Sequence, residues 1–179
     1  ELQGDQFQAV TNQIAELEVP TLCVINGNVF GGGVELSVAC DFRVAADDIV
    51  MRVPAAAIGL CYPIDGIQRL VARLGSTTVK RLLVGAEEFT SPAMEVLGIV
   101  SATYPPSTLM ENANLLAQKL SELAPLAVTS MLSIIDQAEK GQVDATQAAL
   151  LSEHCAQSRD LQEGLSARRE RRRPHFRGE

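Results

Sequence analysis

Three consecutive glycines and a nearby carboxylate form the part of this sequence best suited to chemistry. The glycines, at positions 31–33, follow an apolar run at residues 22–25, and Glu35 stands two positions beyond them. Helical spacing then continues to Cys40. The pattern predicts a strand, a glycine-rich turn and a helix.

The amino end of such a helix favours a negatively charged ligand atom. The first N–H groups of a helix have no partner within it, and the helix dipole is positive there. Glycine lets a ligand carbonyl approach the main chain, so Gly32 N–H is a candidate oxyanion donor, and Glu35 is a candidate acid/base beside that carbonyl. A purely structural explanation also exists, because glycines make tight turns and the dipole favours a glutamate in the first helical turn.

The residues around this motif form a longer pattern. Residues 19–36 and 39–45 closely resemble the signature of the crotonase superfamily, the enoyl-CoA hydratase/isomerase family. The similarity continues through residues 52–54, 58–60 and 66–70 to residues 98–100 and resumes at residues 158–176, so it covers essentially the whole chain. The resemblance implies an α/β fold, a crotonase-like spiral of ββα units followed by a carboxy-terminal helical trimerisation region.

The apolar periodicity agrees with an α/β core followed by helices. We divide the chain into the core at residues 1–104 and a helical region of the same domain at residues 105–179. Helices are also predicted within the core, where we expect Ser91 to start one and to form a capping box with Glu95, four positions further on. The predicted strands are residues 22–25, 42–45, 49–53 and 99–103, and the predicted helices include residues 32–40, 66–74, 77–84, 107–123, 125–140 and 143–157.

The first residues of the chain fall inside the helix expected before the glycine motif. Family members usually begin with several strands and a segment that supplies one oxyanion N–H and much of the CoA pocket. We therefore expect an amino-terminally shortened crotonase domain whose core is incomplete at that end.

The resemblance implies action on an acyl-CoA thioester through oxyanion (enolate) stabilisation, with Gly32 as donor and Glu35 as the retained acid/base. Typical hydratases have a second glutamate where this chain has Ala55. A methyl group cannot orient water or transfer a proton, so we expect hydration to be slowed by ~10²–10⁴-fold. A one-base reaction such as double-bond isomerisation is the simplest chemistry that remains.

Asp65 is a candidate substitute for the missing acid. It lies just before the helix predicted at residues 66–74, where an aspartate is equally suited to be the N-cap. Dienoyl-CoA isomerase-like members have an aspartate two positions earlier, at the place of Pro63. Tyr62, in the same loop, either lines the acyl pocket or packs against the core.

Two other functions are compatible with these residues. The same enolate-binding junction supports hydrolysis or decarboxylation of an acyl-CoA. A noncatalytic acyl-CoA-binding or assembly protein is the third reading, because Ala55 and the shortened amino end both remove groups that catalysis uses.

Arginines are concentrated at the carboxyl end. Residues 159–179 contain seven arginines and four acids, whereas the whole chain has a net charge of −7. No aromatic residues alternate with these arginines, so we do not predict nucleic-acid binding, and a solvated helix face is one explanation. The resemblance adds another, in which Arg168, Arg171 and Gly31 contact the CoA moiety. CoA is then part of the substrate, and we expect no separate cofactor.

Composition indicates an ordinary soluble domain. The chain has 179 residues, 46% of them hydrophobic, and no run long enough to cross a membrane, so we expect a cytoplasmic protein without membrane contact. Its four cysteines lack CxxC spacing and its two histidines lie far apart, which predicts reduced thiols and no metal site. The apolar faces after residue 107 need a cover, and the resemblance implies a homotrimer or hexamer. These faces include Leu115, Leu116, Leu120 and Leu123.

Overall fold

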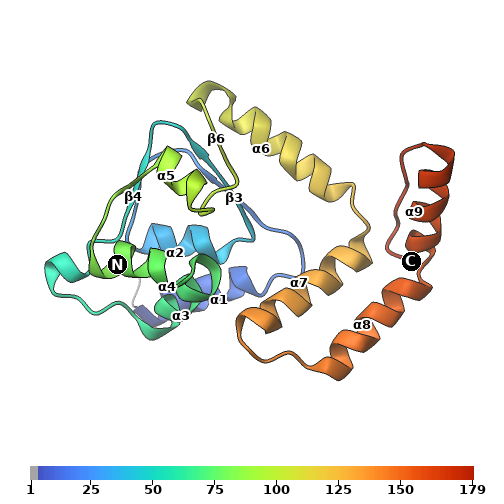
Figure 1. Ribbon diagram of the computed structural model, residues 1–179, viewed down its shortest axis with the longest axis horizontal. Helices are drawn as coiled ribbons and strands as arrows, with labels where there is room; N and C mark the ends of the chain where they lie inside the picture. Colours follow the sequence, from blue (N-terminus) through green and yellow to red (C-terminus); the bar gives the residue numbers. More distant parts are fainter. Residues whose placement is uncertain (1–3) are drawn as a thin grey trace. The chain divides into compact units, whose positions relative to one another are not determined.

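The computed structural model describes residues 4–179, which form two compact units. The first unit holds the segment ending at Leu17 together with Thr21–Asn114, and the second holds Glu18–Pro20 with Leu115–Glu179. The division we expected at residue 104 stays a prediction. The mixed α/β organisation is confirmed, because strands and helices alternate up to β6 (Ala102–Tyr104) and only helices follow (Figure 1).

A parallel three-stranded sheet lies in the first unit. Its strands run in the order β1 (Leu22–Ile25), β3 (Phe42–Ala46) and β6. Val44 of β3 pairs in register with Val24 of β1 and with Ala102 of β6. The central strand carries the consecutive buried residues Val44, Ala45 and Ala46, as a parallel strand covered on both faces requires.

A second sheet of three short strands lies in the same unit. Its order is β2 (Val29–Phe30), β4 (Val50–Arg52) and β5 (Phe89–Thr90), with β2 parallel and β5 antiparallel to β4. The chain leaves β2 directly into helix α2 (Gly32–Ala39). The glycine motif is therefore held between a sheet and a helix. The helix is the predicted one, but the strand that enters the motif is β2, which the sequence did not indicate.

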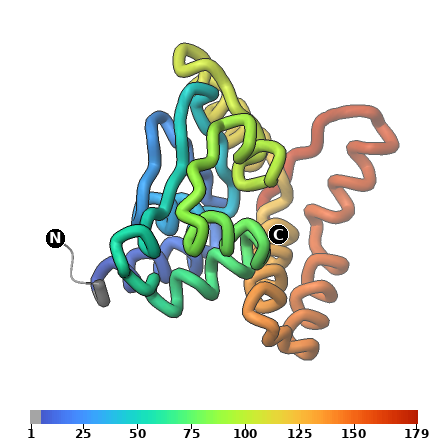
Figure 2. Tube along the Cα trace, turned by 60° about the vertical axis from the view of Figure 1, so that its left-hand side comes forward, coloured from blue at the N-terminus to red at the C-terminus, as the bar shows by residue number. Residues whose placement is uncertain are grey.

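Helix α2 is the centre of the first unit. It packs against α1 (Gly4–Ala15), α3 (Ile64–Leu74) and β2. The path of the chain through these segments can be followed by colour in Figure 2. Its side chains Val34 and Val38 have no exposed surface. The remaining elements of the unit are a 3-10 turn (Ala56–Ile58), α4 (Ser76–Val79), a π-helical turn (Lys80–Val84), α5 (Ser91–Val96) and the first part of α6 (Pro106–Ser121).

The second unit continues from the end of α6 through α7 (Pro125–Glu139), α8 (Ala145–Gln157) and α9 (Arg159–Glu170). Helix α8 packs against both α7 and α9. Asp160 at the start of α9 is buried and accepts hydrogen bonds of 2.8 Å from the backbone N–H groups of Arg177 and Gly178. This carboxylate fastens the end of the chain to α9.

Two local predictions were wrong at the start of α5. Thr90, not Ser91, is the N-cap residue of α5, and no capping box forms, since Glu95 stands four positions after Ser91 where the box needs three. The Ser91 hydroxyl is buried and donates to the Ala46 carbonyl at 2.7 Å, while the Glu95 carboxylate accepts from Thr103 at 2.6 Å. Ser91 thus joins α5 to the end of β3.

Candidate active site

The glycines at the start of α2 are required by backbone shape and by packing. Gly31 has a φ of +52°, a conformation that costs little only for glycine, and its N–H donates to the Arg52 carbonyl at 3.0 Å. A Cβ on Gly32 would lie 3.0 Å from Cζ of Phe7 on α1. The Gly31 N–H is already bonded to β4, so Gly31 serves the turn. Gly32 is the first residue of helix α2.

Glu35 is held inside the unit by side chains from the two neighbouring helices. Its side chain is only 1% exposed, and Oε1 lies 3.0 Å from Arg69 Nη1 of α3. The same oxygen accepts a hydrogen bond of 2.9 Å from Gln8 Nε2 of α1. Asn12, one turn beyond Gln8, accepts from the other terminal nitrogen of Arg69. Side chains of two helices, α1 and α3, therefore fix one carboxylate oxygen.

The second carboxylate oxygen, Oε2, faces the start of α3. A Cβ on Gly66 would lie 2.7 Å from Glu35 Oε2 and 2.6 Å from Cε1 of Tyr62. Burial raises the pKa of the Tyr62 phenol well above its ordinary value, and the neighbouring Glu35 charge raises it further. Glu35 thus has one oxygen occupied by donors and the other beside a neutral phenol.

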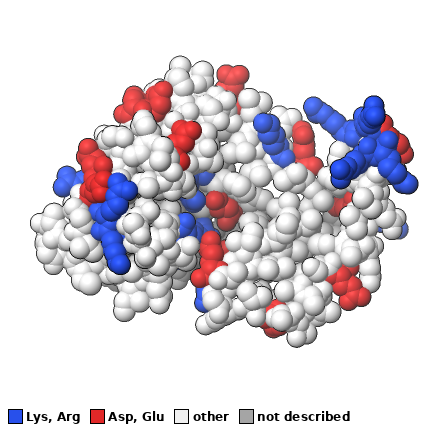
Figure 3. Space-filling model, viewed as in Figure 1, with Lys and Arg blue, Asp and Glu red and all other residues white. Residues whose placement is uncertain are grey.

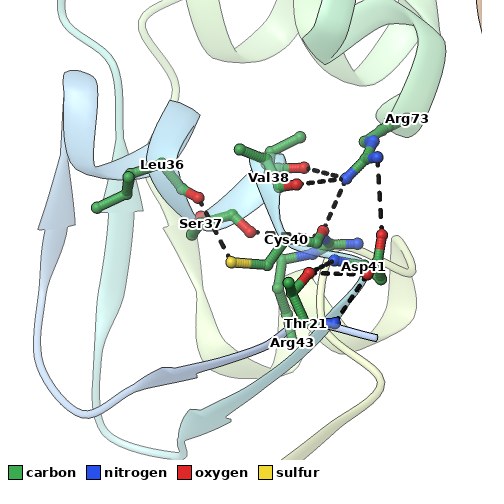
Figure 4. A network of polar contacts seen from close by, with 9 residues as sticks. Thr21, Leu36, Ser37, Val38, Cys40, Asp41, Arg43 and Arg73 are labelled. Atoms are coloured by element: carbon green, nitrogen blue, oxygen red, sulfur yellow. Dashed lines mark hydrogen bonds and ion pairs between the residues drawn. The ribbon is translucent and has the colours of Figure 1, made fainter. Parts of the chain in front are cut away.

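The opposite end of α2 is closed by arginine side chains, as Figure 4 shows. Arg73 Nη1 donates to the carbonyls of Val38, Ala39 and Cys40 at 2.8 to 2.9 Å. Arg43 Nη1 donates to the Cys40 carbonyl at 2.5 Å. Cationic donors at the carboxyl end of a helix satisfy its last carbonyls and complement its dipole. The helix that carries Glu35 is therefore fixed at its far end.

Asp65 does not form the N-cap that its position in the sequence suggested. Helix α3 begins two residues earlier than predicted, at Ile64, because Pro63 before it already has a φ of −57° and serves as the N-cap residue. Asp65 is therefore inside the first turn and is exposed. Ala55 is buried at the start of the 3-10 turn, with 5% of its surface exposed.

The two arginines predicted to bind CoA lie at the end of α9 and are exposed. Arg168 borders an open depression of about 750 Å³, together with Gln162, Leu165 and Arg169. Arg171 ends the helix with a left-handed backbone (φ 55°). Figure 3 shows Lys and Arg side chains gathered over this helix. The unit thus presents a basic surface with an apolar floor.

Not every arginine of this region is available to a ligand. Arg172 forms ion pairs with Glu163 at 2.5 Å and with Glu170 at 2.6 Å. The hydrogen bonds with Arg172 lower the pKa of Glu163 to about 2, helped by the His175 backbone N–H. Arg172 therefore stabilises the turn after α9 through its ion pairs. Arg168 remains exposed and borders the depression.

Sequence reasoning missed the partners of Glu35. Gln8 and Asn12 are four residues apart on α1, so the spacing alone places them on one helical face. Arg69 lies inside a segment that carries the family resemblance, but nothing local to it indicates Glu35, which is 34 positions away. The polar pair on α1 was the one detectable signal.

Other chemical groups are scattered. The described residues include no group of three His, Cys, Asp or Glu side chains that is able to hold a metal ion. All four cysteines are free, with Cys61 exposed and the other three half-buried. Among helices in the described part of the chain, none is long and apolar enough to span a bilayer.

Comparison with known proteins places this geometry in context. The model of the enoyl-CoA hydratase/isomerase family matches residues 1–179. Human mitochondrial enoyl-CoA hydratase domain-containing protein 2 is 33% identical over 97% of this chain and 61% of its own length. The 2,3-dehydroadipyl-CoA hydratase of Escherichia coli is 29% identical over 89% of this chain and 63% of its own. The chain thus spans less than two thirds of these relatives.

Solved structures agree. An enoyl-CoA hydratase/isomerase family protein from Hyphomonas neptunium superposes with a TM-score of 0.88 at 27% identity, over 98% of this chain and 68% of that one. An enoyl-CoA hydratase from Bacillus anthracis gives 0.85 at 27% identity, over 98% and 69%. The fold described above is therefore shared with these structures.

Proposed function

We propose that this chain, which belongs to the enoyl-CoA hydratase/isomerase family, transfers protons at the carbons next to an acyl-CoA thioester. One observation carries the proposal. Glu35 is buried one turn beyond Gly32, at the amino end of α2, with Oε1 fixed by Arg69 and Gln8. A fixed carboxylate beside an oxyanion donor is the arrangement that enolate chemistry needs.

The chemistry follows from these two groups. Electron density moves onto the thioester oxygen when a proton leaves the carbon chain or when water adds to it, and Gly32 N–H stabilises the resulting enolate. Glu35 takes a proton at one position and delivers it at another. Double-bond isomerisation needs only this one base, and hydration needs water oriented beside it as well.

The basic end of α9 supplies a place for the nucleotide of CoA. Arg168 and Arg171 are exposed, and Arg168 borders a depression that includes the apolar side chain of Leu165. A guanidinium binds phosphate and stacks on a purine. CoA enters as part of the substrate, and the proposed reaction requires no further cofactor.

Glu35→Gln tests this function directly. The amide still accepts from Arg69 and Gln8 but cannot take a proton, so turnover of crotonyl-CoA or of a 3-enoyl-CoA should fall by ~10²–10⁴-fold. Glu111→Gln, on an exposed face of α6, is the matched control and should leave turnover unchanged. Thermal unfolding checks that each variant is folded. Equal turnover in wild type and Glu35→Gln would refute the role.

A noncatalytic acyl-CoA-binding protein is the second candidate, and Ala55 favours it. Its buried methyl group stands where typical hydratases have an acid. Calorimetric titration with CoA and acyl-CoA, combined with product analysis, separates the candidates. Stoichiometric binding without conversion of any thioester supports the binding protein, whereas free CoA or CO₂ as product supports a hydrolase or decarboxylase.

Self-association is part of the same proposal. Leu115 and Leu123 are 50% and 48% exposed, and Met131 and Ile135 on α7 are 55% and 53% exposed. Apolar surface of this kind is usually covered by a partner, and a homotrimer or hexamer is our prediction. Light scattering coupled to size exclusion tests it, and a monodisperse monomer at micromolar concentration would contradict it. The cytoplasm remains the predicted location.

A further inference from the structure

Tyr62 lies on the side of Glu35 Oε2, the carboxylate oxygen that Arg69 and Gln8 do not bond. The phenol belongs to the loop between the 3-10 turn and α3 and is half-buried. The point where a Cβ on Gly66 would sit is 2.6 Å from the edge of its ring and 2.7 Å from Glu35 Oε2. Tyrosine and carboxylate therefore flank the same glycine.

Gly66 is what permits this arrangement. Any larger residue would push a methyl group into both neighbours, since real Cβ atoms essentially never approach heavy atoms closer than 3.0 Å. Gly66 is also buried. The absence of a side chain here keeps Tyr62 beside Glu35 rather than apart from it.

The two carboxylate oxygens have different surroundings. Oε1 accepts from Arg69 and Gln8, while the side of Oε2 faces Tyr62. Arg69 is itself held by Asn12 and is only 11% exposed, so the carboxylate plane is fixed by groups on both other helices. Oε1 is thus engaged by both neighbouring helices, and Oε2 is the oxygen on the side of the phenol.

We propose that Tyr62 is the second polar group of the proton-transfer site, a positioning residue that orients Glu35 Oε2 and the water that exchanges protons with it. This inference rests on the function proposed above and deepens it. It supplies, seven positions after Ala55, an orienting group that Ala55 itself lacks. With Tyr62 orienting the water, the site retains the groups that hydration needs.

The protonation state of the phenol suits this task. Burial and the Glu35 charge raise its pKa, while the Arg69 charge lowers it to a smaller extent. The phenol therefore keeps its proton at neutral pH and acts as a neutral donor and acceptor of hydrogen bonds. It takes no proton from the substrate, and Glu35 remains the base.

The step balances without another reactant. Water oxygen forms a bond to the β carbon as one water O–H bond breaks, and that proton goes to Glu35 Oε2. The π electrons move to the thioester oxygen, giving the enolate at Gly32 N–H. Glu35 then returns the proton to the α carbon, the enolate electrons form the new C–H bond, and the carbonyl is restored.

Kinetics of Tyr62→Phe test the proposal, with Tyr104→Phe on β6 as the matched control. Phenylalanine keeps the ring and removes the hydroxyl. Loss of an orienting hydrogen bond to a charged group should lower kcat by about 10–100-fold, with KM changed less than about twofold. A kcat equal to that of Tyr104→Phe would overturn the proposal.

Titration of the phenols gives a readout that does not depend on activity. The chain has two tyrosines and no tryptophan, so phenolate absorbance reports Tyr62 and Tyr104 alone. In Tyr104→Phe the remaining phenol should ionise well above its ordinary pH, and adding Glu35→Gln should bring that pH down because a neighbouring negative charge is lost. An unchanged titration would overturn the pairing.

The two tests separate this inference from the function beneath it. A protein that converts no enoyl-CoA, but whose Tyr62 titration responds to Glu35→Gln, would contradict the proposed function and support the pairing. A protein whose turnover needs Glu35 but is indifferent to Tyr62→Phe would support the function and overturn the inference.

Discussion

The two ends of α2 are built in opposite ways. At the carboxyl end, Arg73 donates to three successive backbone carbonyls and Arg43 donates to the last of them. At the amino end, no side chain caps the helix, and the residues there are glycines. The carboxyl end is therefore closed by arginine side chains, whereas the amino end is open in the sense that no side chain caps it.

This difference explains how a short helix can support chemistry. A helix of eight residues has little stability of its own, so its position depends on packing and on its ends. Fixing the carboxyl end with cations leaves the amino end free for a developing negative charge without loosening the helix. We infer that the arginines at the carboxyl end of α2 hold the helix, and therefore Glu35, in position.

Breaking the closed end should have the largest effect on stability. Arg73→Ala leaves the Val38 and Ala39 carbonyls without their charged donor, while Cys40 keeps Arg43, and we expect the free energy of unfolding to fall by about 3 kcal/mol. Arg159→Ala is the control, because the Arg159–Glu179 pair is exposed and such pairs contribute little to stability. Urea unfolding measures both. Similar losses in the two variants would show that the closed end is unimportant.

Filling the open end should mainly affect turnover. Gly66→Ala places a methyl group within 3 Å of both Tyr62 and Glu35, so one of them must shift. Misplacement of a catalytic group by about 1 Å costs roughly 10²-fold in rate. Steady-state kinetics with crotonyl-CoA tests this, with Gly98→Ala as a strained variant outside the site. If Gly98→Ala lost more turnover than Gly66→Ala, the space at Gly66 would have no catalytic meaning.

Part of this contrast was predictable from the sequence. The glycine motif, the helix after it and Glu35 within its first turn follow from local spacing, and the structure has the helix at Gly32–Ala39. The bonds that fix Glu35 come from residues 27 and 34 positions away, so no periodicity within α2 indicates them.

The wrong predictions have the same physical origin. Asp65 matched a local N-cap preference, but Pro63 started the helix earlier. Ser91 matched an N-cap, but Thr90 holds that position and the Ser91 hydroxyl bonds to the end of β3. In both cases local preference is weaker than a neighbouring backbone restriction or a buried hydrogen bond.

Adding an acid at the position of Ala55 should have the smallest effect. Ala55→Glu restores the group found in typical hydratases, and we expect hydration of crotonyl-CoA to rise by about tenfold, below the full range of a general acid/base because the new carboxylate must be buried. Ala55→Gln, which adds the same bulk without a proton-transferring group, is the control. No difference between these variants would mean that the pocket has diverged beyond one side chain.

The most direct test of the account is a crystal structure with a saturated acyl-CoA, which binds but cannot accept water. We predict a thioester oxygen within about 3 Å of Gly32 N, at the open end of α2, with the α and β carbons facing Glu35 Oε2. A thioester oxygen bound elsewhere, with the amino end of α2 left to solvent, would contradict the claim that this end is built for an enolate.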